Sequence, residues 1–155
     1  MILELEVPFE TEEGYQYIIG FKEVNSVPDN YNIKLVDVTI ALISENIESN
    51  SLKTLNKFID IILDFLSKND VILYYYCDIV PIKIRTNRKN IFSPQEFRFT
   101  LFSKMFNKQK SEKFYLQDII IEDEVGGNHY VSLISRISNK ETVELVKQDI
   151  EKFNK

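Results

Sequence analysis

The fold is decided by residues 71–77, which read V-I-L-Y-Y-Y-C. This run holds seven apolar or aromatic residues in a row, with no polar residue between them. A run of this length without alternation is typical of an interior strand that is covered on both faces of a sheet. The sequence therefore predicts a sheet that contains this strand, with further strands beside it and helices packed on it.

Upstream of this run, the chain predicts three strands and one helix. Alternation of apolar and acidic residues predicts a strand at 2–7, and β-forming residues predict strands at 15–21 and 33–43. The second half of the third strand is also compatible with a helix. Apolar residues at helical spacing form a wide stripe from residue 51 to Asn69-Asp70, which predicts an amphipathic helix.

Downstream, the order of elements continues with a helix, two strands and a closing helix. Residues 93–96 read S-P-Q-E, a capping box with Pro at the first helical position, so they predict a helix over 93–107. Residues 114–121 and 129–137 predict an antiparallel pair, and 141–153 predict the last helix. The order βββ-α-β-α-ββ-α predicts an α+β fold with a mixed, mainly antiparallel sheet and about three helices. The length of 155 residues suits a single domain, 1–155.

Composition predicts a cytoplasmic protein. Cys77 is the only cysteine, so an intramolecular disulfide is impossible, as is usual in a reducing compartment. The first residues lack the basic stretch and apolar run of a secretory signal. No apolar run approaches the ~20 residues that a membrane-spanning helix requires. We therefore expect no membrane partner.

Charge is unevenly distributed along the chain. Residues 83–113 hold nine basic and two acidic residues, a net of +7, whereas the whole chain has a formal charge of −5. The remainder therefore carries −12. Such segregation occurs in proteins that present one face to an anionic partner, although a merely solvated run of charges is the alternative.

The candidate binding residues lie in this basic region. Loop cations and the nearby start of the 93–107 helix both favour anions. The residues that we expect to bind an anion or a partner are Lys83, Arg85, Arg88, Lys89 and Arg98. Asp78 follows the interior strand and is a candidate accessory residue, since functional acids often follow such a strand end. A turn cap that accepts backbone hydrogen bonds is the more ordinary role for Asp78.

Other chemistry finds little support in the sequence. One His and one Cys cannot form a structural zinc site. Residues 122–124 with Asp118 could offer oxygen ligands to a cation, but a solvated acidic turn is the better interpretation. Cys77 and His129 are a weak nucleophile–base pair, because a Cys at the end of an apolar strand is usually buried. The four glycines form no phosphate-binding loop. We therefore predict no catalytic residues, no metal and no cofactor.

Three segments carry a resemblance to a known family. They are V-I-L-Y-Y-Y-C-D at 71–78, F-R-F-T-L-F-S-K-M-F at 97–106 and H-Y-V-S-L-I-S-R-I-S-N-K at 129–140. Together with the basic connection, they resemble an uncharacterised family of small Bacteroidetes proteins over about the C-terminal half of the chain. Met105 stands where that family usually has Trp, and no second acid follows Asp78. The resemblance implies that Asp78 and the arginines form a unit, and it implies no activity.

Two functions remain open from the sequence. The first is a non-catalytic interaction or regulatory module, an immunity-protein or antitoxin-like partner, that uses the basic face to bind a protein with an acidic surface. Nucleic acid is a less favoured partner, because the acidic remainder repels a phosphate backbone. The second is a metal-dependent enzyme acting on a phosphorylated ligand such as a nucleotide or nucleic acid. There, Asp78 would bind metal or act as base, and Arg85, Arg88 and Arg98 would hold phosphate. The sequence does not indicate whether the chain forms oligomers.

Overall fold

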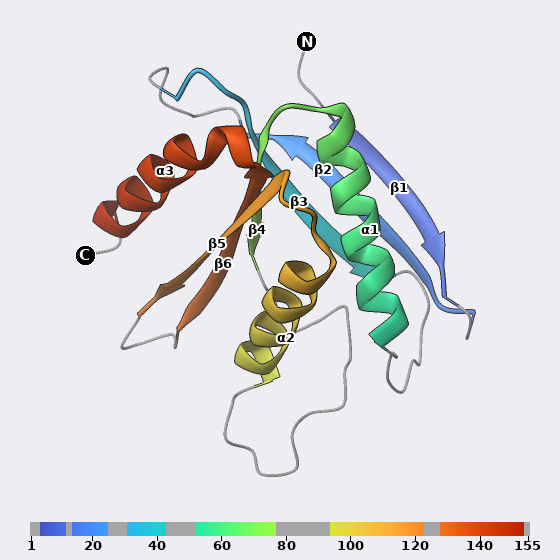
Figure 1. Cartoon of the computed structure of the whole chain (residues 1–155). Helices are drawn as coiled ribbons and strands as arrows, with labels where there is room; N and C mark the ends of the chain where they lie inside the picture. The colour runs from blue at the N-terminus through green and yellow to red at the C-terminus, as the bar shows by residue number, and fades with distance from the viewer. Residues whose placement is uncertain are drawn as a thin grey trace.

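A computed structural model describes residues 4–11, 14–24, 31–42, 52–76, 94–122 and 128–153 (Figure 1). The strands are β1 (Glu4–Glu10), β2 (Gln16–Glu23), β3 (Leu35–Leu42), β4 (Ile72–Tyr76), β5 (Phe114–Ile121) and β6 (His129–Arg136). The helices are α1 (Leu52–Lys68), α2 (Pro94–Gln109) and α3 (Lys140–Phe153), and a 3-10 turn at Ile137–Asn139 leads into α3. This order confirms the predicted α+β class and the predicted sequence of elements.

The six strands form one mixed sheet in the order β1-β2-β3-β4-β6-β5. Every neighbouring pair is antiparallel except β3 and β4, which are parallel. Parallel neighbours require a long crossover connection, and α1 lies in the segment that joins these two strands. The edge strand β1 contains Pro8 and three glutamates, which disfavour pairing with a further strand.

Helices α1 and α2 cover one face of the sheet and enclose the larger core. The apolar stripe predicted for α1 is buried there, and Phe65 stacks on Phe21 of β2 with ring centroids 3.9 Å apart. Phe58 of α1 and Phe102 of α2 both contact the ring of Tyr75 in β4, at centroid distances of 5.4 and 4.9 Å. Aromatic packing thus ties both helices to the central strand.

Helix α3 packs on the opposite face, which we call the outer face, mainly over β5 and β6, and Ile72 of β4 belongs to the same core. In Figure 1, α2 and α3 lie on opposite sides of these two strands. Val143 and Val146 of α3 are buried in a second core with Val131 and Leu133 of β6. The alternation of the β6 side chains between the two cores follows from the period of two in a strand.

The position of β4 confirms an interior strand, but its coverage differs from the prediction. Ile72 and Leu73 are fully buried, whereas Tyr74 is half-buried and Tyr76 is 39% exposed. The difference arises because none of the helices that the structure describes covers the outer face at Tyr74 and Tyr76, whereas Ile72 on the same face is buried. Within the described part of the chain, no helix combines the length and the apolar character needed to cross a membrane.

Candidate functional site

A groove opens where the parallel strands β3 and β4 approach their carboxyl ends. It has a volume of about 380 Å³ and is lined by residues 37–40 of β3 and 74–76 of β4. β4 ends at Tyr76, whereas β3 continues to Leu42. In open sheets with parallel strands, ligands commonly bind outside the carboxyl ends of those strands. The groove is therefore a natural candidate for a binding site.

The strand register decides which side chains reach the open side of the groove. Asp37 pairs with Tyr74, and both lie on the outer face. Thr39 and Tyr76 come two residues later on the same face of their strands. Asp37, Thr39 and Tyr76 are exposed, and Tyr74 is half-buried. The groove thus presents one carboxylate, one aliphatic hydroxyl and two phenol rings.

Gly20 in the neighbouring strand β2 makes room for this arrangement. It pairs with Thr39, and a Cβ atom at position 20 would lie 2.9 Å from the Thr39 Oγ1 atom. Real Cβ atoms essentially never approach another atom so closely. The absence of a side chain at position 20 therefore allows Thr39 to keep its place beside the groove.

Tyr76 is held at the end of the groove by a residue that is distant in sequence. Its hydroxyl and the Nδ1 atom of His129 are 2.5 Å apart, and the two ring centroids are 5.8 Å apart. Which atom donates depends on the tautomer of the imidazole. His129 had been a candidate base for Cys77, which lies outside the described residues. Within the described part, His129 contacts the phenol of Tyr76.

The groove shifts the pKa of two of its groups. Partial burial raises the pKa of the Asp37 carboxyl, and the nearby Lys22 ammonium lowers it by a smaller amount. Burial also raises the pKa of Tyr74, and the charges of Asp37 and Tyr76 raise it further. Tyr74 is therefore a neutral phenol at neutral pH. Asp37 is a carboxyl group whose charge is less well solvated than that of a free side chain.

Asp118 belongs to a separate polar cluster beneath α2. Its Oδ1 atom accepts hydrogen bonds from the Ser103 hydroxyl at 2.8 Å and from the Ser132 hydroxyl at 3.1 Å. Burial raises the pKa of Asp118, and these two hydrogen bonds lower it by less. Asp118 therefore serves the contact between α2 and the sheet. Among the described residues, no group of three His, Cys, Asp or Glu side chains could hold a metal ion.

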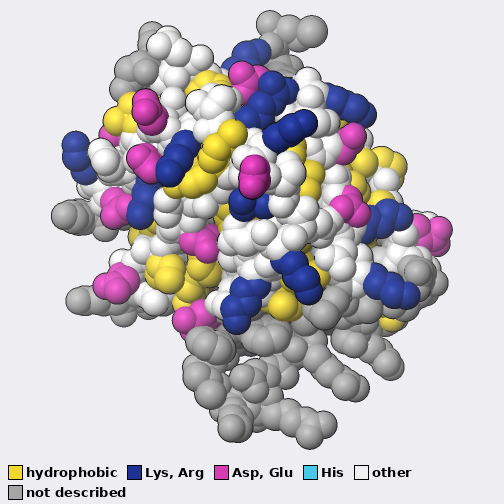
Figure 2. Space-filling view, in the orientation of Figure 1, with side chains coloured by type: hydrophobic (Ala, Val, Ile, Leu, Met, Phe, Trp, Pro, Cys, Tyr) yellow, Lys and Arg dark blue, Asp and Glu magenta, His cyan; other side chains and the backbone are white. Residues whose placement is uncertain are grey.

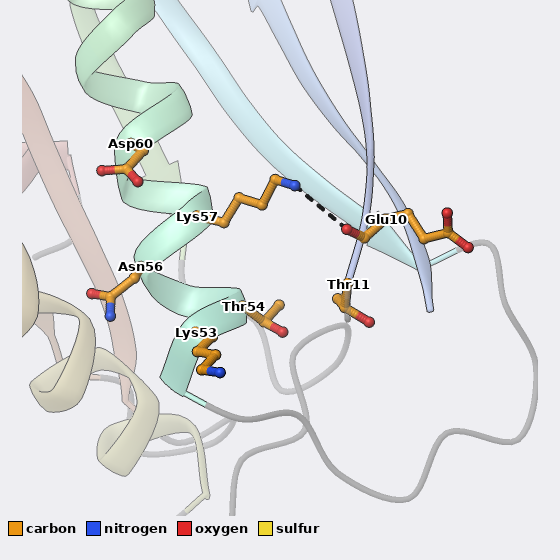
Figure 3. Close-up of a pocket in the computed structure, with 7 residues that line it drawn as sticks. All are labelled: Glu10, Thr11, Lys53, Thr54, Asn56, Lys57 and Asp60. Atoms are coloured by element: carbon orange, nitrogen blue, oxygen red, sulfur yellow. Dashed lines mark hydrogen bonds between the residues drawn. The ribbon is translucent and has the colours of Figure 1, made fainter. Parts of the chain in front are cut away.

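A second recess lies between the end of β1 and the first turns of α1 (Figure 3). Its volume is about 410 Å³, and its lining residues are Glu10, Thr11, Lys53, Thr54, Asn56, Lys57 and Asp60. The Lys57 ammonium donates to the backbone carbonyl of Glu10 at 3.5 Å, while the Glu10 carboxylate points away from the recess. The Asp60 carboxylate accepts a hydrogen bond from the Gln109 amide. Contacts within the chain thus already engage its central charged groups, which makes this recess the weaker candidate.

A third, more apolar groove continues along α1 from this recess. Its volume is about 520 Å³, and it shares Lys57 and Asp60 with the recess. Leu5 and Val7 of β1 form part of its wall, and Leu5 is 45% exposed. Two carboxylates, of Asp60 and Asp64, and two ammonium groups, of Lys57 and Lys68, line it, so its net charge selects no particular ligand.

Most of the sequence-predicted site residues lie outside the described part of the chain. These are Asp78, Lys83, Arg85, Arg88 and Lys89. Arg98 lies in α2, but its side chain is not described. The structure therefore does not test whether these residues come together.

The described part of the basic region runs from α2 to the turn before β5. Lys104, Lys108 and Lys113 are exposed, and Lys110 is half-buried. On the face of the molecule seen in Figure 2, Lys and Arg side chains are interspersed with Asp and Glu side chains.

Comparison of the chain with known protein families, with curated proteins and with solved structures finds no match. The similarity to the uncharacterised Bacteroidetes family accordingly stays a resemblance between motifs. Inference about function therefore rests on the residues of the groove and of the charged surfaces.

The sequence did not single out the groove, although one signal for it was present. Tyr74 and Tyr76 are two residues apart and so share one face of a strand. Asp37 and Thr39 have the same spacing in β3. Only the parallel pairing of the two strands, which are separated by α1, brings these four side chains to one place.

Proposed function

We propose that this chain is a non-catalytic protein-interaction module of the regulatory kind, an immunity-protein or antitoxin-like partner. Its basic segment, residues 83–113, binds an acidic surface of a partner protein. The proposal rests on the charge of this segment, +7 against −12 for the remainder. Electrostatic complementarity of this kind steers association and selects the partner.

The exposure of the described lysines in this segment supports the proposal. Three lysines elsewhere in the fold each pair with a carboxylate, in the bridges Lys34–Glu23, Lys68–Asp64 and Lys147–Glu151. Among the residues that the structure describes, Lys104, Lys108, Lys110 and Lys113 form no ion pair, and the same holds for Lys22, Lys57, Lys140 and Lys152. Lys104 and Lys108 are four residues apart and exposed, so they share one side of α2.

Charge reversal in the full-length chain tests the proposal. The chain is used as bait in a lysate of its native host, captured proteins are identified, and binding is then measured with purified components. We expect Arg85→Glu with Arg88→Glu to abolish the interaction, and Lys104→Glu with Lys108→Glu to weaken it at least tenfold. Lys147→Glu with Lys152→Glu makes the same change of charge on α3 and should leave binding intact. Retained binding in both basic-segment variants would refute the proposed surface.

The enzyme alternative has one observation in its favour. The groove lies at the carboxyl end of β4, and Asp78 follows Tyr76 by two residues. A hydrolysis screen against nucleotides and nucleic acids with Mg²⁺ or Mn²⁺ tests it. Activity that disappears in Asp78→Asn would support a phosphorylated substrate. Absence of activity, or activity that persists in this variant, would leave the interaction module as the function.

A further inference from the structure

Of the helices that the structure describes, none covers the outer face of β1, β2 and β3, and this sheet surface is acidic. We call this surface the acidic face and define it by the outward residues of these strands and of the end of β4. Its charged members are Glu4, Glu6, Glu10, Lys22 and Asp37, all of which are exposed. Four carboxylates against one ammonium group give it a net charge of −3. The strand register places these residues on one side of the sheet, opposite α1 and α2.

The groove between β3 and β4 lies where the acidic face meets the part of the sheet that α3 covers. Its polar wall is the Asp37 carboxylate, and its aromatic wall is formed by Tyr74 and Tyr76. Burial raises the pKa of Asp37, so the neighbouring side chains leave its charge incompletely solvated. Lys22 is the basic residue next to it in the register. A further cation placed in the groove would compensate the Asp37 charge.

Carboxylates and phenol rings together favour one class of ligand. A guanidinium or ammonium group makes charge-assisted hydrogen bonds to a carboxylate and is attracted to the face of an aromatic ring. Nucleic acid and an anionic lipid surface would both be repelled by the four carboxylates. An apolar segment would remove water from the same carboxylates without offering any group to balance their charge.

We propose that the acidic face binds an extended cationic segment of a partner protein, and that one Arg or Lys side chain of this segment occupies the groove. The charged head group contacts Asp37, and its alkyl stem lies along the rings of Tyr74 and Tyr76. The remaining cations of the segment face Glu4 and Glu6. This surface is separate from the basic segment 83–113 and carries the opposite charge.

Binding of model peptides to the full-length chain tests this proposal. The probes are a capped peptide of alternating Gly and Arg and a capped peptide of alternating Gly and Glu, each measured by calorimetry at low and high salt. We expect only the Arg peptide to bind, with an affinity that falls as salt rises. Asp37→Asn should weaken binding by about five- to tenfold, since it removes the charge and keeps the shape.

Variants of the aromatic wall and of a remote carboxylate give matched controls. Tyr76→Leu should lower the affinity for the Arg peptide by about threefold or more. Tyr76→Phe keeps the ring and should bind the peptide nearly as well as the wild type. Glu144→Gln removes one exposed carboxylate from α3 and should leave binding unchanged. If Glu144→Gln weakens binding as much as Asp37→Asn, the Arg peptide is responding only to the net charge, and the proposal fails.

Two further measurements make the outcome independent of the variants. Amide chemical shifts of the wild-type chain should change on addition of the Arg peptide at residues 37–39 and 74–76, and changes confined to other elements would overturn the assignment. Sedimentation of the chain alone tests a second copy as the occupant. Salt-sensitive self-association that is lost in Asp37→Asn would replace the proposed partner by the chain itself. Arg85→Glu with Arg88→Glu should leave peptide binding intact, so this inference and the proposed function fail independently.

Discussion

Asp118 holds two buried hydroxyl groups between α2 and the sheet, and its replacement by Ala gives a sharp test of how α2 is attached. Ser103 is 7% exposed and Ser132 is 0% exposed, and both donate to the same Oδ1 atom. A buried hydroxyl left without a partner costs about 1–3 kcal/mol. Two such hydroxyl groups would cost about 2–6 kcal/mol. The net cost is smaller, because a hydroxyl can form a new hydrogen bond to the backbone and because the variant no longer holds a poorly solvated charge. We expect Asp118→Ala to lower the free energy of unfolding by about 2–3 kcal/mol at pH 7.

Asp118→Asn separates the role of the acceptor from that of the charge. The amide oxygen can accept both hydroxyl groups, so we expect a change of less than about 1 kcal/mol at pH 7. The pKa of Asp118 is raised in the folded state, so the folded chain binds its proton more tightly than the unfolded chain does. This carboxyl therefore favours folding most at low pH, and that contribution declines as pH rises through the interval between the unfolded and folded pKa values. The Asn variant lacks this component.

Urea denaturation followed by circular dichroism measures both effects. The three proteins are compared at pH 7 and in steps down to about pH 4, near the ordinary pKa of a carboxyl group. The wild type should gain stability relative to Asp118→Asn as pH is lowered. An Ala variant within 1 kcal/mol of the wild type would refute the role of Asp118 as a shared acceptor. Equal losses in the Ala and Asn variants would show that the charge, and not the acceptor oxygen, holds α2.

Three further predictions concern stability, each measured by urea denaturation. Gly20→Ala places a Cβ against the Thr39 hydroxyl and should cost about 1–2 kcal/mol, and Thr39→Ala in the same chain should recover part of this loss. The Arg136 guanidinium donates to the carbonyl of Leu66 at 2.9 Å and also to the next carbonyl, so Arg136→Lys should lose about 1 kcal/mol because an ammonium group cannot reproduce this fork. Phe65→Ala removes a fully packed ring that stacks on β2 and should cost about 3–5 kcal/mol, whereas Phe65→Leu should cost less than half of that.

The helices and strands could be predicted because each depends on the local spacing of apolar residues in the sequence. The apolar positions of α1 recur at helical spacing, and the structure buries Leu55, Phe58, Ile62 and Leu66 on one side. The order of the strands was not predictable in this way. Parallel pairing of β3 with β4 and the insertion of β6 between β4 and β5 depend on contacts between segments far apart in the chain.

The candidate site, like the strand order, depends on contacts between segments far apart in the chain. Asp37 and Tyr74 are separated by the whole of α1, and His129 lies further along the chain still. No spacing in the sequence connects these positions, so sequence reasoning assigned Tyr74 and Tyr76 to a covered strand. The basic segment could be identified from composition alone, because a run of charges needs no folding information to be recognised. Its residues 83–89 lie outside the described part of the chain, and their role stays a prediction.

The geometry of the helical layers explains why half of the outer face is polar. A helix with its side chains is about 10 Å wide and neighbouring strands lie about 4.8 Å apart, so one helix covers roughly two strands. Two helices on one side therefore protect most of six strands, whereas α3, the helix that the structure describes on the other side, leaves outward residues of β1, β2 and β3 exposed. The glutamates of β1 and the exposed Lys22, Asp37 and Thr39 suit a surface that is solvated in the free protein. An obligate subunit interface would be apolar at its centre. The register also places Pro8, Ile18 and Ala41 side by side on this face. A partner would therefore meet a small apolar strip between charged residues, which suits a contact that can dissociate.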